Sequence, residues 1–218
     1  MKTSLRLAAM VPFALAAAAF GQTITETFDS GIPATWSKVD NFPIPGSPLF
    51  SAVPWSTNIP ESMGNYTGQP GQAATASSHN HPGQYDVSLI TPIFPMPATG
   101  GGLSYFINFR RVDAFEAFDT NLSINGGPWI TMVHETTSQG AAYSTAPPHV
   151  AVGIGLGFFG ALPGDSLRVE FRYYSTFLLP MVHNEYVEID SVTYPSPTPG
   201  AALPMLGAAT AFAIRRRR

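Results

Sequence analysis

The sequence predicts an all-β fold, an antiparallel jelly-roll-like β-sandwich. Two observations support this prediction. Between residues 23 and 194 apolar side chains recur at every second position in several segments, which is the pattern of strands with one buried face. The chain of 218 residues also contains 20 glycines and 21 prolines but only 11% charged residues, so turns are frequent and long charged helices are disfavoured.

Three segments show the alternation clearly. Residues 103–109 place alternate apolar side chains on one face. Residues 120–133 predict a hairpin, because Asn125, Gly126 and Gly127 at their centre tolerate the positive φ angles of a tight turn. Residues 186–194 predict the last strand of the domain. One antiparallel sandwich over residues 22–194 accounts for this pattern.

A further strand is predicted over residues 167–173, where charged and apolar residues alternate. Arg168, Glu170 and Arg172 therefore face outward. The inward side chains are Leu167, Val169, Phe171 and Tyr173. By contrast, residues 41–83 are rich in proline, glycine, serine and asparagine, so they predict a long loop with short extended pieces.

The N-terminus predicts export. Lys2 and Arg6 precede an apolar run over residues 7–20, and Ala19 and Gly21 stand at the positions that a signal peptidase requires before a cleavage at Gln22. Residues 1–21 are therefore interpreted as a secretory signal peptide. A buried first helix is the alternative, although Pro12 would interrupt it.

The C-terminus, residues 195–218, combines a proline-rich motif, an apolar segment over residues 201–214 and a basic end. At about 1.5 Å per residue, a helix of this segment falls short of the roughly 30 Å hydrocarbon core, so it spans a membrane only with help. The segment resembles a PEP-CTERM-type sorting tail, which implies an exosortase-type processing enzyme and delivery to the outer surface or extracellular matrix. The carrying residues are Pro197, Thr198, Pro199, Gly200, Ala201, Arg215, Arg216, Arg217 and Arg218. A basic tail without a sorting role is the alternative.

Charge and cysteine content exclude several functions. Without its two terminal signals the chain keeps 5 basic and 14 acidic residues, a net charge of −9. Such a surface repels polyphosphate, so nucleic-acid binding is not expected. The chain has no cysteine, which removes disulfides, thiolate metal sites and thiol nucleophiles from consideration.

The order of the predicted strands and turns resembles the choice-of-anchor J family of bacterial surface domains, which are related in shape to MAM and cleaved-adhesin modules. The carrying segments are residues 26–29 with Pro33 and Trp36, and residues 88–92, 103–109, 123–129, 163–165 and 187–192. The resemblance covers essentially the whole mature chain. It implies a jelly-roll-like sandwich on the cell surface and no chemistry.

Two binding sites follow from this likeness of fold. Jelly-roll modules often hold a structural Ca²⁺ between their first and last strands, and Glu26, Asp29, Glu188 and Asp190 are the candidate ligands, supplemented by carbonyl oxygens. Exposed aromatic side chains stack on pyranose rings, and the candidates are Trp55, Tyr66 and Trp129, with Asn58 and Asn65 nearby. A solvated acidic face and ordinary core packing are the respective alternatives.

Two further motifs have a possible chemical interpretation. Residues 164–167 spell the Gly-Asp-Ser-Leu signature of an esterase family, but Ser166 precedes a strand instead of a helix, and a turn entering the strand is the preferred interpretation. His79 and His81 have a spacing that suits zinc or copper, but lack an identifiable third ligand. The sequence therefore predicts a non-enzymatic surface-anchored or matrix-associated envelope protein. A carbohydrate- or calcium-dependent adhesive module is the alternative, and a secreted hydrolase comes third.

Overall fold

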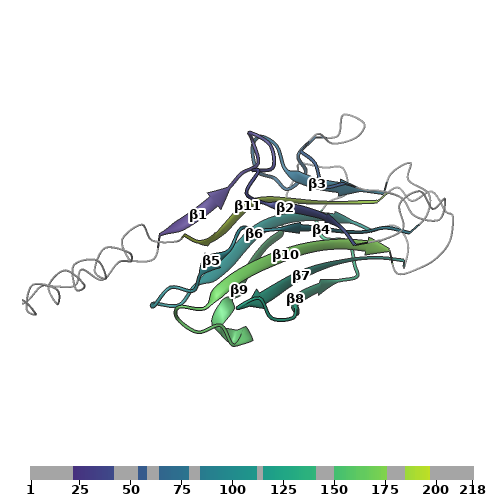
Figure 1. Cartoon of the computed structure of the whole chain (residues 1–218). Helices are drawn as coiled ribbons and strands as arrows, with labels where there is room; N and C mark the ends of the chain where they lie inside the picture. The colour runs from purple at the N-terminus through teal and green to yellow at the C-terminus, as the bar shows by residue number, and fades with distance from the viewer. Residues whose placement is uncertain are drawn as a thin grey trace, which may run out of the picture. The chain divides into compact units, whose positions relative to one another are not determined.

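The computed structural model describes residues 22–41, 54–57, 64–78, 84–111, 115–140, 150–175 and 185–196. These residues form two antiparallel sheets (Figure 1). The strands are β1 (Thr23–Glu26), β2 (Ser37–Asp40), β3 (Ala74–Ser77), β4 (Asp86–Ile90), β5 (Phe94–Pro95), β6 (Gly102–Arg110), β7 (Glu116–Ile124), β8 (Ile130–Glu135), β9 (Val150–Gly155), β10 (Ser166–Ser175) and β11 (Tyr186–Pro195). A short 3₁₀-helix, η2 (Leu156–Phe159), follows β9. No helix of the described residues is long and apolar enough to cross a membrane.

The first sheet has the order β1-β11-β6-β9, and β3 also pairs with β11. β3 and β1 share one edge of β11: β3 pairs with its first half and β1 with its last residues. Between them the register of β11 against β6 shifts, and Ser191 has a positive φ of 50°. This β-bulge interrupts the ladder at the point where β3 and β1 meet.

The second sheet has the order β2-β4-β10-β7-β8, with β5 paired to the start of β10. β10 is its central strand and pairs with β4 on one side and β7 on the other. The turn between β7 and β8 contains Asn125 and Gly126 at φ values of 53° and 71°. Two successive positive φ angles are the geometry of a tight hairpin turn, so the predicted hairpin is confirmed.

The core lies between the two sheets and is dominated by aromatic rings. Phe171 on β10 is stacked with Trp36 at 6.3 Å between ring centroids and meets Tyr105 of the other sheet edge-on at 5.2 Å. Phe28 and Tyr194 contact the same indole. All of these rings are at most 5% exposed. Burying aromatic surface of this extent is the main source of stability for a chain with few charges and no disulfides.

The β-sandwich is thus confirmed, and the five strands predicted from alternation, two of them in the 120–133 hairpin, all form. β10 presents the inward and outward residues as its alternation predicted. Within the long loop predicted over residues 41–83, residues 74–77 form the buried strand β3, which alternation does not reveal because small residues fill it. Residues 1–21 and 197–218 lie outside the described residues, and with them both terminal signals and the whole sorting motif. The same holds for Asn58, His79 and His81.

Candidate functional site

The face of the second sheet that points away from the core carries a row of polar side chains. The pairing brings them together: Glu170 of β10 lies opposite Asn121 of β7, which lies opposite Thr131 of β8. One step along, Arg172 lies opposite Ser88 of β4. Because side chains alternate along each strand, these residues share the outer face while their neighbours enter the core.

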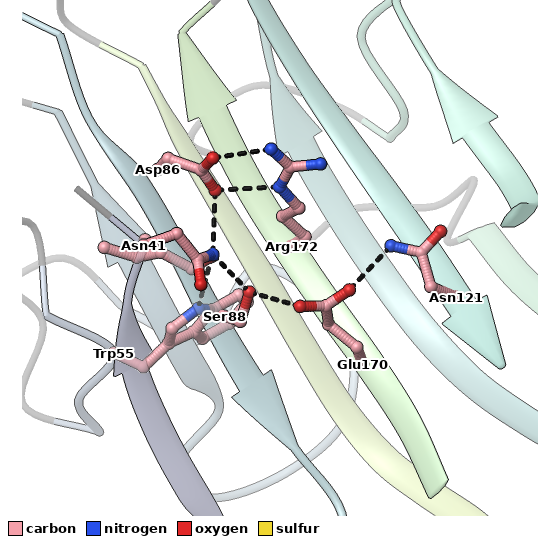
Figure 2. Close-up of polar contacts among 8 residues, drawn as sticks. Asn41, Trp55, Asp86, Ser88, Asn121, Glu170 and Arg172 are labelled. Carbon is pink, nitrogen blue, oxygen red and sulfur yellow. Dashed lines mark hydrogen bonds and ion pairs between the residues drawn. The ribbon is translucent and has the colours of Figure 1, made fainter. Parts of the chain in front are cut away.

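Glu170 is the centre of this polar network and is only 5% exposed. Its Oε1 accepts a hydrogen bond of 2.6 Å from the Ser88 hydroxyl, and its Oε2 accepts one of 2.8 Å from Asn121 Nδ2 (Figure 2). The amide of Asn41 donates in turn to Ser88 at 2.8 Å and to Asp86 at 2.9 Å. A buried carboxylate satisfied at both oxygens fixes the side chains around it.

Arg172 forms the second half of the network. Its Nε and Nη2 donate to the two carboxylate oxygens of Asp86 at 2.8 and 2.5 Å (Figure 2). The hydrogen bonds with Asp86 raise the pKa of Arg172 above its usual value. The guanidinium carbon also lies 4.5 Å from the centre of the Tyr174 ring. This bidentate ion pair fixes the orientation of the guanidinium on the sheet. Nη1 is the guanidinium nitrogen that does not bond Asp86.

A pocket of about 350 Å³ opens above this network. Its lining residues are Asn41, Asn121, Trp129, Thr131, Glu170 and Arg172. The Trp129 side chain is 41% exposed, which is unusual for tryptophan, and supplies a flat apolar wall. The volume lies at the small end of the roughly 300–1,000 Å³ of small-molecule sites.

The pocket contains one unsatisfied acceptor. Asn121 is 3% exposed, and its Oδ1 has no hydrogen-bond partner. The positions of the amide oxygen and nitrogen are fixed, because Nδ2 donates to the carboxylate of Glu170. A buried carbonyl oxygen without a partner costs about 1–3 kcal/mol, so a hydrogen bond from a ligand hydroxyl or a water molecule that reached this covered atom would stabilise the site.

The three aromatic residues predicted to stack on sugars lie in different surroundings. Trp129 lines the pocket. Trp55 is 1% exposed and donates its indole N–H to the Val87 carbonyl at 3.4 Å, so its prediction as a glycan platform is wrong. It is buried because Ser56 pairs with Thr75 and draws the loop onto the sheet. Tyr66 is half-buried against Tyr186, and the structure places it beside β11 on the other sheet.

The predicted calcium ligands come together in part, at the bulge of β11. Glu188 and Asp190 are both fully buried. Glu188 Oε2 accepts a hydrogen bond of 2.8 Å from the backbone N–H of Tyr66, and Asp190 Oδ2 accepts one of 2.8 Å from Asn65 Nδ2. Burial raises the pKa of Asp190, and the nearby carboxylate of Asp29 acts in the same direction.

The environment of these carboxyls disfavours their charged forms. Burial raises the pKa of Glu188 to about 8, and burial likewise raises that of Asp190 to about 6. Glu188 Oε1 has no hydrogen-bond partner. Glu26 pairs with Val192 beyond the bulge, and burial, followed by the charge of Glu26, raises the pKa of Tyr194. Among the described residues, no group of three His, Cys, Asp or Glu could hold a metal unaided.

The Gly-Asp-Ser-Leu segment is a turn and the start of β10. Ser166 is exposed, and its hydroxyl donates to Asn125 Oδ1 at 3.2 Å. Asp165 accepts hydrogen bonds from the Leu162 N–H at 2.7 Å and from Asn125 Nδ2 at 2.8 Å, and the first of these lowers its pKa. Both residues therefore fasten the turn to the β7–β8 hairpin, in agreement with the preferred interpretation.

Sequence reasoning identified Trp129 but missed the network beneath it. Glu170 and Arg172 were expected to face outward, yet nothing linked them to Asn121, Ser88 or Asn41. The signal that was available is the polar alternation on both strands of the 120–133 hairpin. Combined with the outward face of β10, it points to a polar patch at the centre of one sheet.

Comparisons with known proteins support the fold. No family model and no curated protein sequence matches the chain. The K3 cleaved adhesin domain of Lys-gingipain from Porphyromonas gingivalis is similar in structure, with a TM-score of 0.54, 20% identity and coverage of 79% of this chain and 98% of that one. The K1 cleaved adhesin domain of the same protein gives a TM-score of 0.52 at 21% identity, covering 81% and 99%. At these identities the similarity establishes a jelly-roll-like β-sandwich.

Proposed function

We propose that this chain is an exported, non-enzymatic module of the bacterial envelope that binds a neutral glycan in the pocket of its second sheet. The observation that carries the proposal is the unsatisfied Asn121 Oδ1 beside the exposed ring of Trp129. A pyranose offers an apolar face to the indole and hydroxyl protons to the carbonyl oxygen. Nη1 of Arg172 supplies a donor for an adjacent hydroxyl.

The charges around the pocket favour a neutral ligand. Arg172 is paired with Asp86 and Asp119 is hydrogen-bonded to His134, while Glu170 adds a negative charge to the same face. The mature chain carries a net charge of −9. Carboxylated or sulfated polysaccharides would meet repulsion here, whereas a neutral polysaccharide of the envelope or matrix would not.

The terminal segments support export and anchoring. Residues 1–21 have the pattern of a signal peptide, and residues 195–218 resemble a sorting tail that an exosortase-type enzyme would process at the membrane. The resemblance to choice-of-anchor J domains agrees with this location. In this proposal the sandwich is the part of the protein that remains on the surface or in the matrix.

One experiment tests binding and export together, on protein taken from native cells. Its intact mass should correspond to a chain beginning near Gln22, and the material should bind neutral but not carboxylated polysaccharides on a panel. Trp129→Ala should weaken binding by about fivefold or more, because stacking of a flat nucleobase on an aromatic side chain accounts for about 1–3 kcal/mol. Phe158→Ala, which removes an exposed ring outside the pocket, is the control and should bind normally. Equal binding by both variants would exclude this pocket.

A second candidate function is calcium binding at the β11 bulge, and the unpartnered Oε1 of the buried Glu188 favours it. Asp29 and Asp190 would provide further charge, with amide and carbonyl oxygens of residues 65–67 completing the shell of six to eight oxygens that calcium takes. The cation would hold together β11, β1 and the segment that precedes β3. It would stabilise the fold instead of taking part in a reaction.

Calcium is therefore expected to raise the melting temperature. At a hundredfold excess over its Kd the stabilisation is about 2.7 kcal/mol, or several degrees for a domain of this size. The effect should be larger near pH 8 than near pH 5, because Glu188, with a pKa of about 8, must lose its proton to bind. Differential scanning calorimetry with calcium and with chelator measures it. Asp190→Asn should abolish the shift and Asp40→Asn, on β2, should keep it. A shift retained in Asp190→Asn would place the ion elsewhere.

A further inference from the structure

One end of the sandwich is apolar and exposed. The 3₁₀-helix η2 and the turn after it carry Phe158, 93% exposed, and Leu162, 66% exposed. A phenylalanine almost wholly in water has no role in the core of this domain. Two large apolar side chains within five residues of one turn form a projection, which we name the apolar tip (Leu156–Phe159 with Leu162).

The sequence around the apolar tip is free of charge. Residues 150–164 contain no acidic, basic or histidine residue, and neither do residues 91–109, which include the neighbouring strand β5. This is notable in a domain whose net charge is −9. The first acidic residue after the tip, Asp165, folds back onto the Leu162 N–H and Asn125. Asp165 is therefore a partly exposed acidic residue next to the tip, and its carboxylate is turned onto this turn.

The chain leaves the sandwich at the same end. The Leu156 N–H donates to the Gly101 carbonyl at 3.1 Å, and the Gly164 N–H donates to the Met96 carbonyl at 2.9 Å. Pro195, the last residue of β11, packs so closely on Gly101 that a Cβ there would lie 2.8 Å from its Cγ. In Figure 1 the end of β11, the start of β1, β5 and the turn after β9 lie toward the same side. The segment 96–101 therefore links the apolar tip to the exit of the chain.

The sequence beyond this exit limits what the tip can face. Four residues, 197–200, separate Ser196 from the apolar segment 201–214 and the four terminal arginines. Four residues span at most about 14 Å. If segment 201–214 is held in a membrane, as the proposed function requires, the end of the sandwich that carries Phe158 and Leu162 stays within a short tether of the lipid surface.

We propose that the apolar tip docks on the lipid surface, with Phe158 and Leu162 inserted at the interface, for as long as the C-terminal segment anchors the chain. The inference rests on the anchoring in the proposed function and adds a contact that fixes the orientation of the domain. Aromatic and leucine side chains are the residues that interfacial segments insert. Because residues 150–164 carry no charge, the contact needs no anionic lipid.

The absence of cysteine makes a direct test available. Phe158→Cys in the full chain gives a single site for a spin label, and Thr137→Cys, exposed after β8 at the other end of the hairpin, gives the matched control. Each labelled chain is reconstituted into vesicles of phosphatidylethanolamine and phosphatidylglycerol. The accessibility of the label to a water-soluble relaxant and to oxygen, which concentrates in lipid, is then measured with and without vesicles.

Docking predicts that vesicles lower the water-phase accessibility of the label at position 158 several-fold and raise its oxygen accessibility, while position 137 does not change. Sedimentation with the vesicles reports anchoring separately. If both labelled chains sediment with the vesicles but both labels stay accessible to the water-soluble relaxant, the docking is wrong and the anchoring stands. A chain that does not sediment would overturn both. Protection at position 158 without vesicles, with spin–spin broadening, would assign the tip to contact between copies and also overturn the proposal.

Discussion

Replacing Glu116 with glutamine is expected to make the folded domain more stable than the unmodified chain at alkaline pH and to flatten its pH dependence. Glu116 begins β7, faces the core and is fully buried. Its Oε2 accepts a hydrogen bond of 2.6 Å from the Tyr173 hydroxyl. Burial first, and then the neighbouring carboxyl of Glu185, raise the pKa of Glu116 to about 10. The folded state therefore holds this carboxyl in its neutral form.

The sign of the pH effect follows from linkage. The unfolded chain loses this proton near the ordinary pKa of about 4.5, whereas the folded chain keeps it up to about 10. Between these values the folded state binds one more proton than the unfolded state, so stability is fully present at low pH and falls as the pH rises. The slope for one such group is at most about 1.4 kcal/mol per pH unit. Glu188, with a pKa of about 8, adds a loss of the same sign up to that pH.

Glutamine reproduces the neutral carboxyl, since its oxygen accepts from Tyr173 and its amide donates toward Glu185. Urea unfolding near pH 5 and near pH 8 measures the difference. Between pH 5 and pH 8 the free energy of unfolding of the unmodified chain should fall by up to about 4 kcal/mol because of Glu116 alone. This contribution should be absent in Glu116→Gln. Glu135→Gln, on the partly exposed β8, is the matched control and should follow the unmodified chain. If Glu116→Gln showed the same pH dependence of stability as the unmodified chain, Glu116 would be ionised in the folded state.

The architecture was predictable because the alternation of apolar and polar residues along a strand identifies the face of that strand that is buried. On β10 the alternation of Leu167 and Val169 with Arg168 and Glu170 is a local property, and the structure reproduces it. Trp129 was also named as a candidate stacking residue, with core packing as the alternative, and the structure leaves it 41% exposed in the pocket. These predictions needed no knowledge of which strands lie side by side.

The pocket was not predictable in the same way. Its hydrogen bonds join Ser88 to Glu170 and Asn121 to Glu170, across 82 and 49 positions of sequence, so they depend on the register of three strands. A shift of one residue in either pairing would move these side chains into the core. Trp55 shows the reverse error: composition predicted an exposed loop, and the pairing of Ser56 with Thr75 buried the ring.

Because the orientation of Asn121 is set by Glu170, the substitution Glu170→Gln is expected to weaken glycan binding by about tenfold while leaving the fold largely intact. The side chain keeps its shape but exchanges one acceptor oxygen for an NH₂ group. If that group faced Ser88, whose hydroxyl already accepts from Asn41, the serine proton would have no acceptor. The NH₂ group is therefore expected to face Asn121, where it meets another donor.

Asn121 then relieves the conflict by rotating its amide, so that Oδ1 accepts from the introduced NH₂ group at position 170 and Nδ2 points into the pocket. A ligand hydroxyl placed between Asn121 and Nη1 of Arg172 would meet two donors, and its own proton would have no acceptor. An unsatisfied group of this kind costs about 1–3 kcal/mol, and about 1.4 kcal/mol corresponds to tenfold in Kd.

Calorimetric titration with the neutral glycan identified on the panel, together with urea unfolding, separates the two effects. Glu170→Gln should bind about tenfold more weakly and lose about 1 kcal/mol of stability, since two charge-assisted hydrogen bonds become neutral ones. Glu135→Gln makes the same chemical change one strand beyond Asn121 and should bind normally. Unchanged binding by Glu170→Gln would mean that the ligand does not use Asn121 Oδ1. Large losses of both stability and binding would mean instead that the network, and not the polarity of one amide, holds the pocket open.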